Sequence, residues 1–312
     1  MQIQYNKSPD KEKIEAIISA FTENRHSVEY FMRGIQRNIP ICCFEAYDER
    51  EIVGVITAWR THFHPYCTYF SVIVNPLYSH EQVEMKLLQH VRSFQGVLLP
   101  LQTSVWETDH RLRSFYEQAG FEEIRRTYSP SLKLHSLSIS NGDLTDIERA
   151  EHLTVRSLDE VMNNAELKSQ LIILVRDTYQ KTHTANPVGI VDLDYWEELI
   201  FAEDILLEGS YMALNGCEIK SFALLHESSD ATKLELGWRG IRDQSDMRIL
   251  LMLTANQISY AKDSGYTYLD AEIDTTDPYA LEILGCFPFA PSPALITYQL
   301  RSSSTIRAGS EK

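Results

Sequence analysis

The 312-residue sequence contains no apolar run approaching the ~18 residues that a membrane-spanning helix requires. Its opening residues, Met1 to Lys7, lack the apolar core of a secretory signal peptide. The five cysteines are odd in number, and their spacing forms no disulfide framework, so we interpret them as free thiols. We therefore expect a cytoplasmic protein that does not enter a membrane.

Positive charge is also scarce. The sequence has 29 lysines and arginines but 44 aspartates and glutamates, which gives a formal net charge of −15. Nucleic acids and anionic membrane surfaces are bound mainly through cationic side chains, so neither is expected as a partner. An acidic surface either attracts cationic substrates such as amines or serves solubility alone. The sequence does not indicate an oligomeric state.

Several motifs that would reveal a chemistry are absent. The chain has no Walker loop, no dinucleotide-binding fingerprint and no nucleophile elbow. His62, His64 and Cys67 resemble part of a zinc site, but no fourth ligand accompanies them. We therefore predict no metal site.

What the sequence does contain is one order of strands and helices that occurs twice, at a spacing near half the chain. The first set has strands near 3–5, 41–47, 51–60, 68–74 and 97–106, and helices near 10–37, 79–94 and 109–119. The second has strands near 153–156, 206–214, 218–226, 233–241, 266–273 and 294–300, helical segments up to residue 204, a helix near 245–264 and a short helix after Asp277. We predict two domains, 1–140 and 150–305, joined by a polar segment at 135–152.

Two segments of the first half carry a family resemblance. Val74 to Leu88 resembles the central motif of the GNAT acetyltransferases, a strand ending in Val-x-Pro followed by a glycine-rich loop and a helix. His80, Gln82 and Glu84 replace the three glycines of that loop. The stretch Asp109 to Phe121 resembles the second motif of the family, which ends in Phe-Tyr-Glu-Lys-x-Gly-Phe.

The second half resembles tandem members of the same superfamily. Gly240-Ile241 is similar to the Thr-Gly-Val end of the matching strand, and 258–266 is similar to the end of the matching helix. The segment 274–277 resembles their Asp-Ser-Thr-Asn. In this alignment, Asp246 and Arg248 occupy positions where the family has loop glycines. Leu284 occupies the position of the asparagine in the last helix.

The resemblance implies an α/β (α+β) fold of two tandem GNAT-like domains, each a mixed, mainly antiparallel sheet flanked by helices. It also implies acetyl-CoA as co-substrate and a small-molecule amine as acceptor. In such a fold a helix N-terminus binds the coenzyme A pyrophosphate through backbone N–H groups, and two parallel strands splay apart to admit the pantetheine arm. We expect this splay in both halves, with Gly120 and Gly265 ending the helices that precede a strand.

The first domain offers Tyr116 as the acid that protonates the leaving thiolate, although a core tyrosine fits the same helical stripe. Its phosphate loop carries Glu81 and Glu84, which would repel an anion. We therefore assign coenzyme binding to the second domain.

The second domain offers acidic and basic candidates. Glu235 and Glu272 are possible bases, and Glu272 alternates with Asp270 and Asp274 along one strand, where a solvated sheet face is the alternative. Arginines in place of the lost glycines would contact phosphate, unless they form an ordinary surface cluster. The predicted coenzyme-binding residues are Trp238, Arg239, Gly240, Ile241, Arg242, Asp246, Arg248 and Asp277.

Two functions follow from these residues. The first is an acyl-CoA-dependent N-acetyltransferase that acts on an amine. The alternative is a catalytically degenerate acetyltransferase fold that binds a small molecule or a partner, which the loss of loop glycines in both halves favours.

Overall fold

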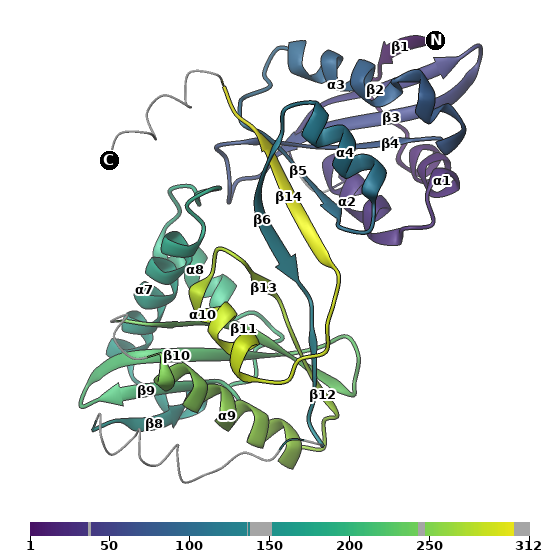
Figure 1. Cartoon of the computed structure of the whole chain (residues 1–312). Helices are drawn as coiled ribbons and strands as arrows, with labels where there is room; N and C mark the ends of the chain where they lie inside the picture. The colour runs from purple at the N-terminus through teal and green to yellow at the C-terminus, as the bar shows by residue number, and fades with distance from the viewer. Residues whose placement is uncertain (37–38, 136, 138–151, 243–246, 303–312) are drawn as a thin grey trace. The chain divides into compact units, whose positions relative to one another are not determined.

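The computed structural model describes residues 1–36, 39–135, 137, 152–242 and 247–302. The chain forms two compact units (Figure 1). The first comprises Met1–Ile124, Ala185–Gly189 and Leu295–Lys312, and the second comprises Arg125–Thr184 and Ile190–Ala294. No single cut in the sequence separates them, in contrast to the predicted division into 1–140 and 150–305. Most of the expected polar segment at 135–152 lies outside the described residues.

The first unit is built on a mixed sheet in the order β1-β2-β3-β4-β5-β14, whose only parallel pair is β4 with β5 among the described strands. Its elements are β1 (Gln2–Tyr5), α1 (Lys11–Phe21), α2 (Arg25–Gln36), β2 (Ile39–Asp48), β3 (Glu51–Arg60), β4 (Thr68–Val74), the 3₁₀ helix η1 (Pro76–Glu81), α3 (Val83–Ser93), β5 (Leu101–Trp106), α4 (His110–Gln118) and β6 (Glu122–Tyr128). The helices α3 and α4 cover one part of the core with Leu87, Leu88 and Tyr116. Helices α1 and α2 supply a second cluster that includes Ile18 and Phe31.

The predicted single helix over 10–37 was wrong, because the chain leaves the helix at Thr22 and re-enters it at Arg25. Thr22 is extended, and its hydroxyl accepts a hydrogen bond from the Asn24 backbone at 3.1 Å. The Asn24 side chain in turn accepts one from the Ser27 backbone at 3.2 Å. These local side-chain bonds compete with the helical ladder and divide it.

The predicted helix over 79–94 also begins later than expected. Residues Pro76–Glu81 form a 3₁₀ turn, and Gln82 takes a left-handed conformation with φ of 55° before α3 starts at Val83. A non-glycine residue rarely adopts this conformation, which the family's glycines accept readily. The expected left-handed cap at Gly120 is confirmed, with φ of 84°.

The second unit has a sheet in the order β7-β12-β11-β10-β9-β8, in which β11 and β12 are parallel and the other described pairs are antiparallel. Its elements are β7 (Ser131–Lys133), β8 (Thr154–Ser157), α6 (Leu158–Val161), α7 (Ala165–Thr182), α8 (Leu193–Ile200), β9 (Tyr211–Asn215), β10 (Glu218–Glu227), β11 (Lys233–Ile241), α9 (Arg248–Asp263), β12 (Tyr268–Ala271), β13 (Ile273–Asp274), α10 (Pro278–Cys286) and β14 (Ala294–Leu300), the last of which pairs in the first unit. Helices flank both sheets, as the α/β prediction requires (Figure 1).

Each unit completes its sheet with a strand from the other half of the sequence. In the first unit, β14 pairs with β5 from Leu295↔Trp106 to Leu300↔Leu101. In the second unit, β7 pairs with β12 from Tyr268↔Lys133 to Asp270↔Ser131. The unit boundary itself falls within β6, between Ile124 and Arg125.

The splayed strands expected from the sequence are present in both units. β4 pairs with β5 only at Thr68 and Tyr69, although β4 continues to Val74. β11 pairs with β12 from Lys233 to Leu236, although β11 continues to Ile241. Beyond these pairs, β4 separates from β5 and β11 separates from β12. Each sheet is therefore open near the carboxyl ends of its two parallel strands. Within the described residues, no helix has both the length and the apolarity to span a bilayer.

Candidate functional site

The splay of the first unit contains a cavity of about 190 Å³. Tyr30 of α2, Ser71 of β4, Ser104 of β5 and Tyr116 of α4 contribute to its wall. Tyr116 is only 2% exposed, and burial raises the pKa of its hydroxyl well above the usual range. The hydroxyl therefore stays protonated at neutral pH, which fits either of its predicted roles, an acid or a core tyrosine.

The first turn of α3 in this unit holds a carboxylate of the chain itself. The Glu84 side chain is 5% exposed and accepts a hydrogen bond from Arg111 of α4, whose side chain is 43% exposed. A helix N-terminus attracts negative charge, and here an internal carboxylate supplies it. The side chains of His80 and Glu81 lie outside the described residues.

Glu84→Gln should lower the free energy of unfolding by about 1.5–3 kcal/mol, the value of a hydrogen bond between charged groups. Arg111→Gln should cost at least as much, because it leaves the carboxylate buried without its cation. Urea denaturation measures both. The matched control is Glu29→Gln, which removes the exposed Arg25–Glu29 pair and should change little. If Glu84→Gln changes the stability no more than this control, the pair behaves as a solvated contact.

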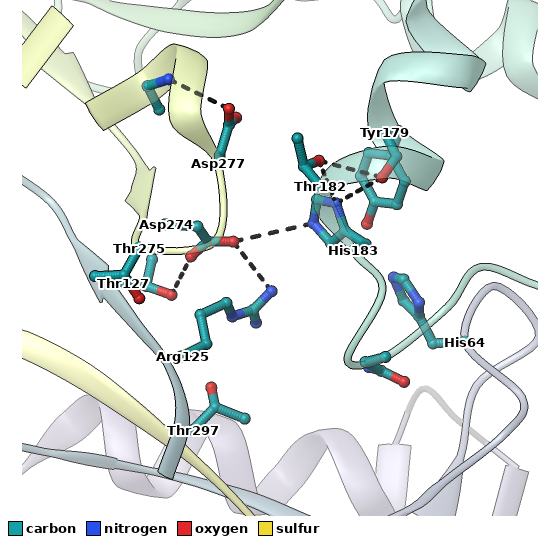
Figure 2. Close-up of polar contacts among 12 residues, drawn as sticks. His64, Arg125, Thr127, Tyr179, Thr182, His183, Asp274, Thr275, Asp277 and Thr297 are labelled. Atoms are coloured by element: carbon teal, nitrogen blue, oxygen red, sulfur yellow. Dashed lines mark hydrogen bonds and ion pairs between the residues drawn. The ribbon is translucent and has the colours of Figure 1, made fainter. Parts of the chain in front are cut away.

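In the second unit, polar side chains gather around Asp274 at the end of β13. Its carboxylate accepts a hydrogen bond from Thr127 and forms an ion pair with Arg125, Nη1 to Oδ2, at 3.0 Å. The Nε2 atom of His183 lies 3.9 Å from the same Oδ2. Figure 2 shows Arg125 and His183 pointing toward this carboxylate from β6 and from the end of α7. Asp274 is 9% exposed, so these charges interact with little screening.

His183 caps the C-terminus of α7, and its own helix orients the ring. Nδ1 lies 3.0 Å from the backbone oxygen of Tyr179 and 2.9 Å from the hydroxyl of Thr182. The ring stacks on Tyr179, with centroids 3.7 Å apart and an interplanar angle of 6°. A proton on Nδ1 satisfies the carbonyl, and Nε2 is then the ring nitrogen that faces the Asp274 carboxylate.

Aromatic rings line the same part of the second unit. The Tyr179 ring lies 5.5 Å from Trp196 and 5.5 Å from Trp238, and the two indoles are 6.0 Å apart. Burial raises the pKa of the Tyr179 hydroxyl well above its usual range. These rings form an apolar wall around the polar groups near Asp274.

Arg239 of β11 and Asp277 at the start of α10 are the remaining charged groups of the splay. The Nε and Nη2 atoms of Arg239 donate to the Gly237 carbonyl at 3.2 and 3.0 Å. Burial lowers the pKa of Arg239 to about 10. Oδ1 of Asp277 caps α10 by accepting from the Tyr279 backbone at 2.9 Å, as the sequence predicted, and burial raises the pKa of this carboxyl.

The other predicted coenzyme-binding residues occupy different environments. Gly240 packs against α7, where an added Cβ would lie 2.7 Å from Thr178, and Ile241 belongs to a buried cluster with Leu250. Arg242 donates to the Ile219 carbonyl at 2.8 Å and forms an ion pair with Glu218 at 3.3 Å. Arg248 is exposed at the start of α9, and Asp246 lies outside the described residues.

The three residues predicted as catalytic belong to different units. Tyr116 belongs to the first unit, whereas Glu235 and Glu272 belong to the second and are exposed. Glu235 accepts from Ser228 at 2.9 Å and stands on the paired part of β11, opposite Asp270. Asp270 is held separately, by Ser131 and by Lys233 at 3.0 Å.

Sequence reasoning missed Arg125, Tyr179 and His183. No motif surrounds them, and they come from β6 and from the end of α7, far from Asp274 in the sequence. The partial zinc pattern also has a different environment in the structure. Cys67 lies 3.4 Å from the Asn186 side chain, and no group of three or more metal-ligating side chains converges among the described residues.

The fold matches solved GCN5-related N-acetyltransferases along nearly its whole length. A GCN5-related N-acetyltransferase from Sphaerobacter thermophilus aligns with a TM-score of 0.59 and 14% identity, over 96% of this chain and 95% of that one. A tandem GNAT protein from the clavulanic acid biosynthesis pathway gives 0.56 and 11%, over 96% and 98%. The glucosamine N-acetyltransferase region of a fungal multi-domain β-N-acetylglucosaminidase gives 0.64 and 11%, over 96% of this chain and 38% of that one.

These likenesses establish the tandem GNAT fold. No protein-family model matches the sequence, and no curated protein matches it.

Proposed function

We propose that the protein is an acyl-CoA-dependent N-acetyltransferase that transfers the acetyl group of acetyl-CoA to a small-molecule amine. The observation that carries the proposal is the splay of β11 and β12 with His183, Asp274 and Arg125 gathered at the end of β13. The likeness to N-acetyltransferases with two tandem domains supports the same reaction class.

The reaction forms a bond between the amine nitrogen and the acyl carbon, and it breaks the bond between that carbon and the thiol sulfur. His183 Nε2 takes the proton that the amine loses, and Asp274 stabilises the imidazolium that results. Arg125 holds the Asp274 carboxylate in place through their ion pair. The imidazolium of His183 then passes this proton to the leaving thiolate, which releases coenzyme A as the thiol and leaves His183 neutral again.

The second unit is the proposed donor site, with the pantetheine arm along the free part of β11. Trp238, Gly240 and Ile241 belong to that part of the strand. Arg242, Asp246 and Arg248 follow it toward the N-terminus of α9, where an anion is favoured. In the first unit, the Glu84 carboxylate occupies the N-terminus of the corresponding helix, α3. We therefore assign that unit a structural role.

Isothermal titration calorimetry with acetyl-CoA tests donor binding, and a thiol-release assay with a panel of amines tests turnover. We expect saturable binding and amine-dependent release of coenzyme A. The absence of both heat and a thermal shift at millimolar acetyl-CoA would rule the function out. Glu29→Gln, which changes an exposed side chain on α2 of the first unit, is the control for both assays.

The second candidate is a degenerate acetyltransferase fold that binds a small molecule or a partner. The Glu84–Arg111 pair at the start of α3 favours it, because the buried Glu84 carboxylate fills one of the two expected anion sites. This candidate predicts ligand binding without thiol release. Amine-dependent release that His183→Gln abolishes would exclude it.

A further inference from the structure

Arg239 has a donor without an acceptor inside the second unit. Its Nη1 atom is buried and has no hydrogen-bond partner, although the residue is only 6% exposed. Its other two donors bind one backbone carbonyl, that of Gly237. A buried donor that lacks an acceptor costs free energy, so its presence here requires an explanation.

The location of Arg239 points to a ligand. The parallel pairing of β11 with β12 ends at Leu236↔Ala271, and Arg239 lies beyond this pair, in the splayed part of the strand. Its charge interacts with Asp277, and Asp277 in turn interacts electrostatically with Asp274. The unused donor therefore belongs to the part of the second unit where the proposed reaction takes place.

Asp277, at the start of α10, supplies a partly exposed carboxylate that interacts electrostatically with Arg239. Its Oδ1 atom caps α10, whereas no hydrogen bond engages Oδ2 among the described residues. Arg239 and Asp277 attract each other electrostatically, but no hydrogen bond or ion pair within 4.0 Å joins them in the described part of the chain. The buried guanidinium of Arg239 and the partly buried carboxylate of Asp277, each with an atom that no described side chain engages, match a ligand that carries both charges.

We propose that the acceptor is an amino acid, whose carboxylate binds Nη1 of Arg239 and whose amine binds Oδ2 of Asp277. This assignment rests on the proposed acyl transfer for the fate of the amine, but the binding site itself does not depend on it. A zwitterion adds no net charge to a site that already holds Asp274 and Asp277. A phosphate group fits less well, because these carboxylates repel a dianion and Nη1 is the single unused atom of the guanidinium.

Calorimetry with three related probes tests the proposal on the full chain. L-phenylalanine carries both charges, 2-phenylethylamine lacks the carboxylate, and 3-phenylpropionate lacks the amine. We expect L-phenylalanine to bind about 10- to 100-fold more tightly than either analogue, because each analogue leaves one charged group without its partner. Equal affinities for L-phenylalanine and 2-phenylethylamine, or no binding of L-phenylalanine, would overturn the proposal.

Two variants separate a ligand-binding role from a structural one. Arg239→Met should abolish the preference for L-phenylalanine over 2-phenylethylamine and leave the melting temperature equal or higher, because it removes a buried charge that lacks a partner. Asp277→Asn keeps the cap of α10, since asparagine is an equally good cap. It should nevertheless weaken the binding of L-phenylalanine by about tenfold or more. If Arg239→Met lowers the melting temperature and keeps the preference, Arg239 is structural and the proposal fails.

Measuring thiol release from acetyl-CoA separates the test of the amino-acid acceptor from the test of the acetyltransferase function. Turnover of plain amines without any advantage for amino acids would overturn the acceptor assignment and leave the acetyltransferase function standing. Conversely, tight binding of L-phenylalanine without any binding of acetyl-CoA would support the zwitterion site and contradict the acetyltransferase function.

Discussion

His183→Gln should lower the rate constant of acyl transfer, kcat, by about 10²- to 10⁴-fold, the usual contribution of a positioned general base. Glutamine retains polarity and approximate length, but it has no group that accepts a proton near neutral pH. Steady-state kinetics with acetyl-CoA and an accepted amine measures the loss. Because His183 acts on the amine, the affinity for acetyl-CoA in calorimetry should stay within about threefold of the unchanged protein, well under the tenfold that 1.4 kcal/mol represents.

His90→Gln is the matched control. His90 also places Nδ1 near the backbone oxygen four residues before it, that of Lys86 at 2.8 Å, but it is exposed on α3 of the first unit. Its replacement should leave kcat unchanged. A loss of less than about threefold for His183→Gln would contradict the assignment of His183 as the base, because even the weakest general bases contribute more.

A fragment of residues 1–140 should fail to fold cooperatively, because it lacks β14. That strand contributes a complete row of partners to β5, and its Ile296 and Tyr298 are at most 1% exposed in the core of the first unit. Burial of each such side chain contributes about 1.5–3 kcal/mol, against a total stability of about 5–15 kcal/mol for a domain. Differential scanning calorimetry and near-ultraviolet circular dichroism should show no cooperative transition.

Appending residues 294–302 to the same fragment through a glycine–serine linker should restore a single transition. A control with Ile296→Asp and Tyr298→Asp in the appended strand should not restore it, since both side chains would have to bury charge. If the plain fragment melts cooperatively with native spectra, β14 is dispensable, and the sequence-based boundary near residue 140 defines an autonomous domain.

The local sequence pattern predicted an element correctly wherever the residues of that element alone determine its structure. The β-branched run of β3 and the strands β4, β11 and β14 have their predicted positions, within a residue, because periodicity and turn residues act locally. The short helix predicted after Asp277 begins there for the same reason, with Asp277 as its cap. The breaks at Thr22 and Gln82 were missed because helical propensity continues through both positions.

The candidate site was predicted less well than the fold. Asp274, Arg239 and Asp277 were singled out because they fall at the ends of predicted elements in motifs that resemble the GNAT pattern. His183 and Arg125 have no such context, since they come from α7 and β6 and meet Asp274 only through packing. The unused Nη1 of Arg239 is likewise invisible in a sequence, because it depends on burial and on missing neighbours.

The sequence by itself determined the tandem α/β architecture and the parallel strand pairs, because the order of elements and the right-handed crossover leave few alternatives. The splay of those pairs was expected only from the resemblance to the GNAT superfamily. The tertiary structure alone decided which strand completes which sheet. Nothing in the sequence of the three-residue strand β7 or of the last strand, β14, indicates which strand it pairs with. Contacts between segments far apart in the chain select the partner. The same holds for the site around Asp274, where charges from distant segments meet because the fold buries them together.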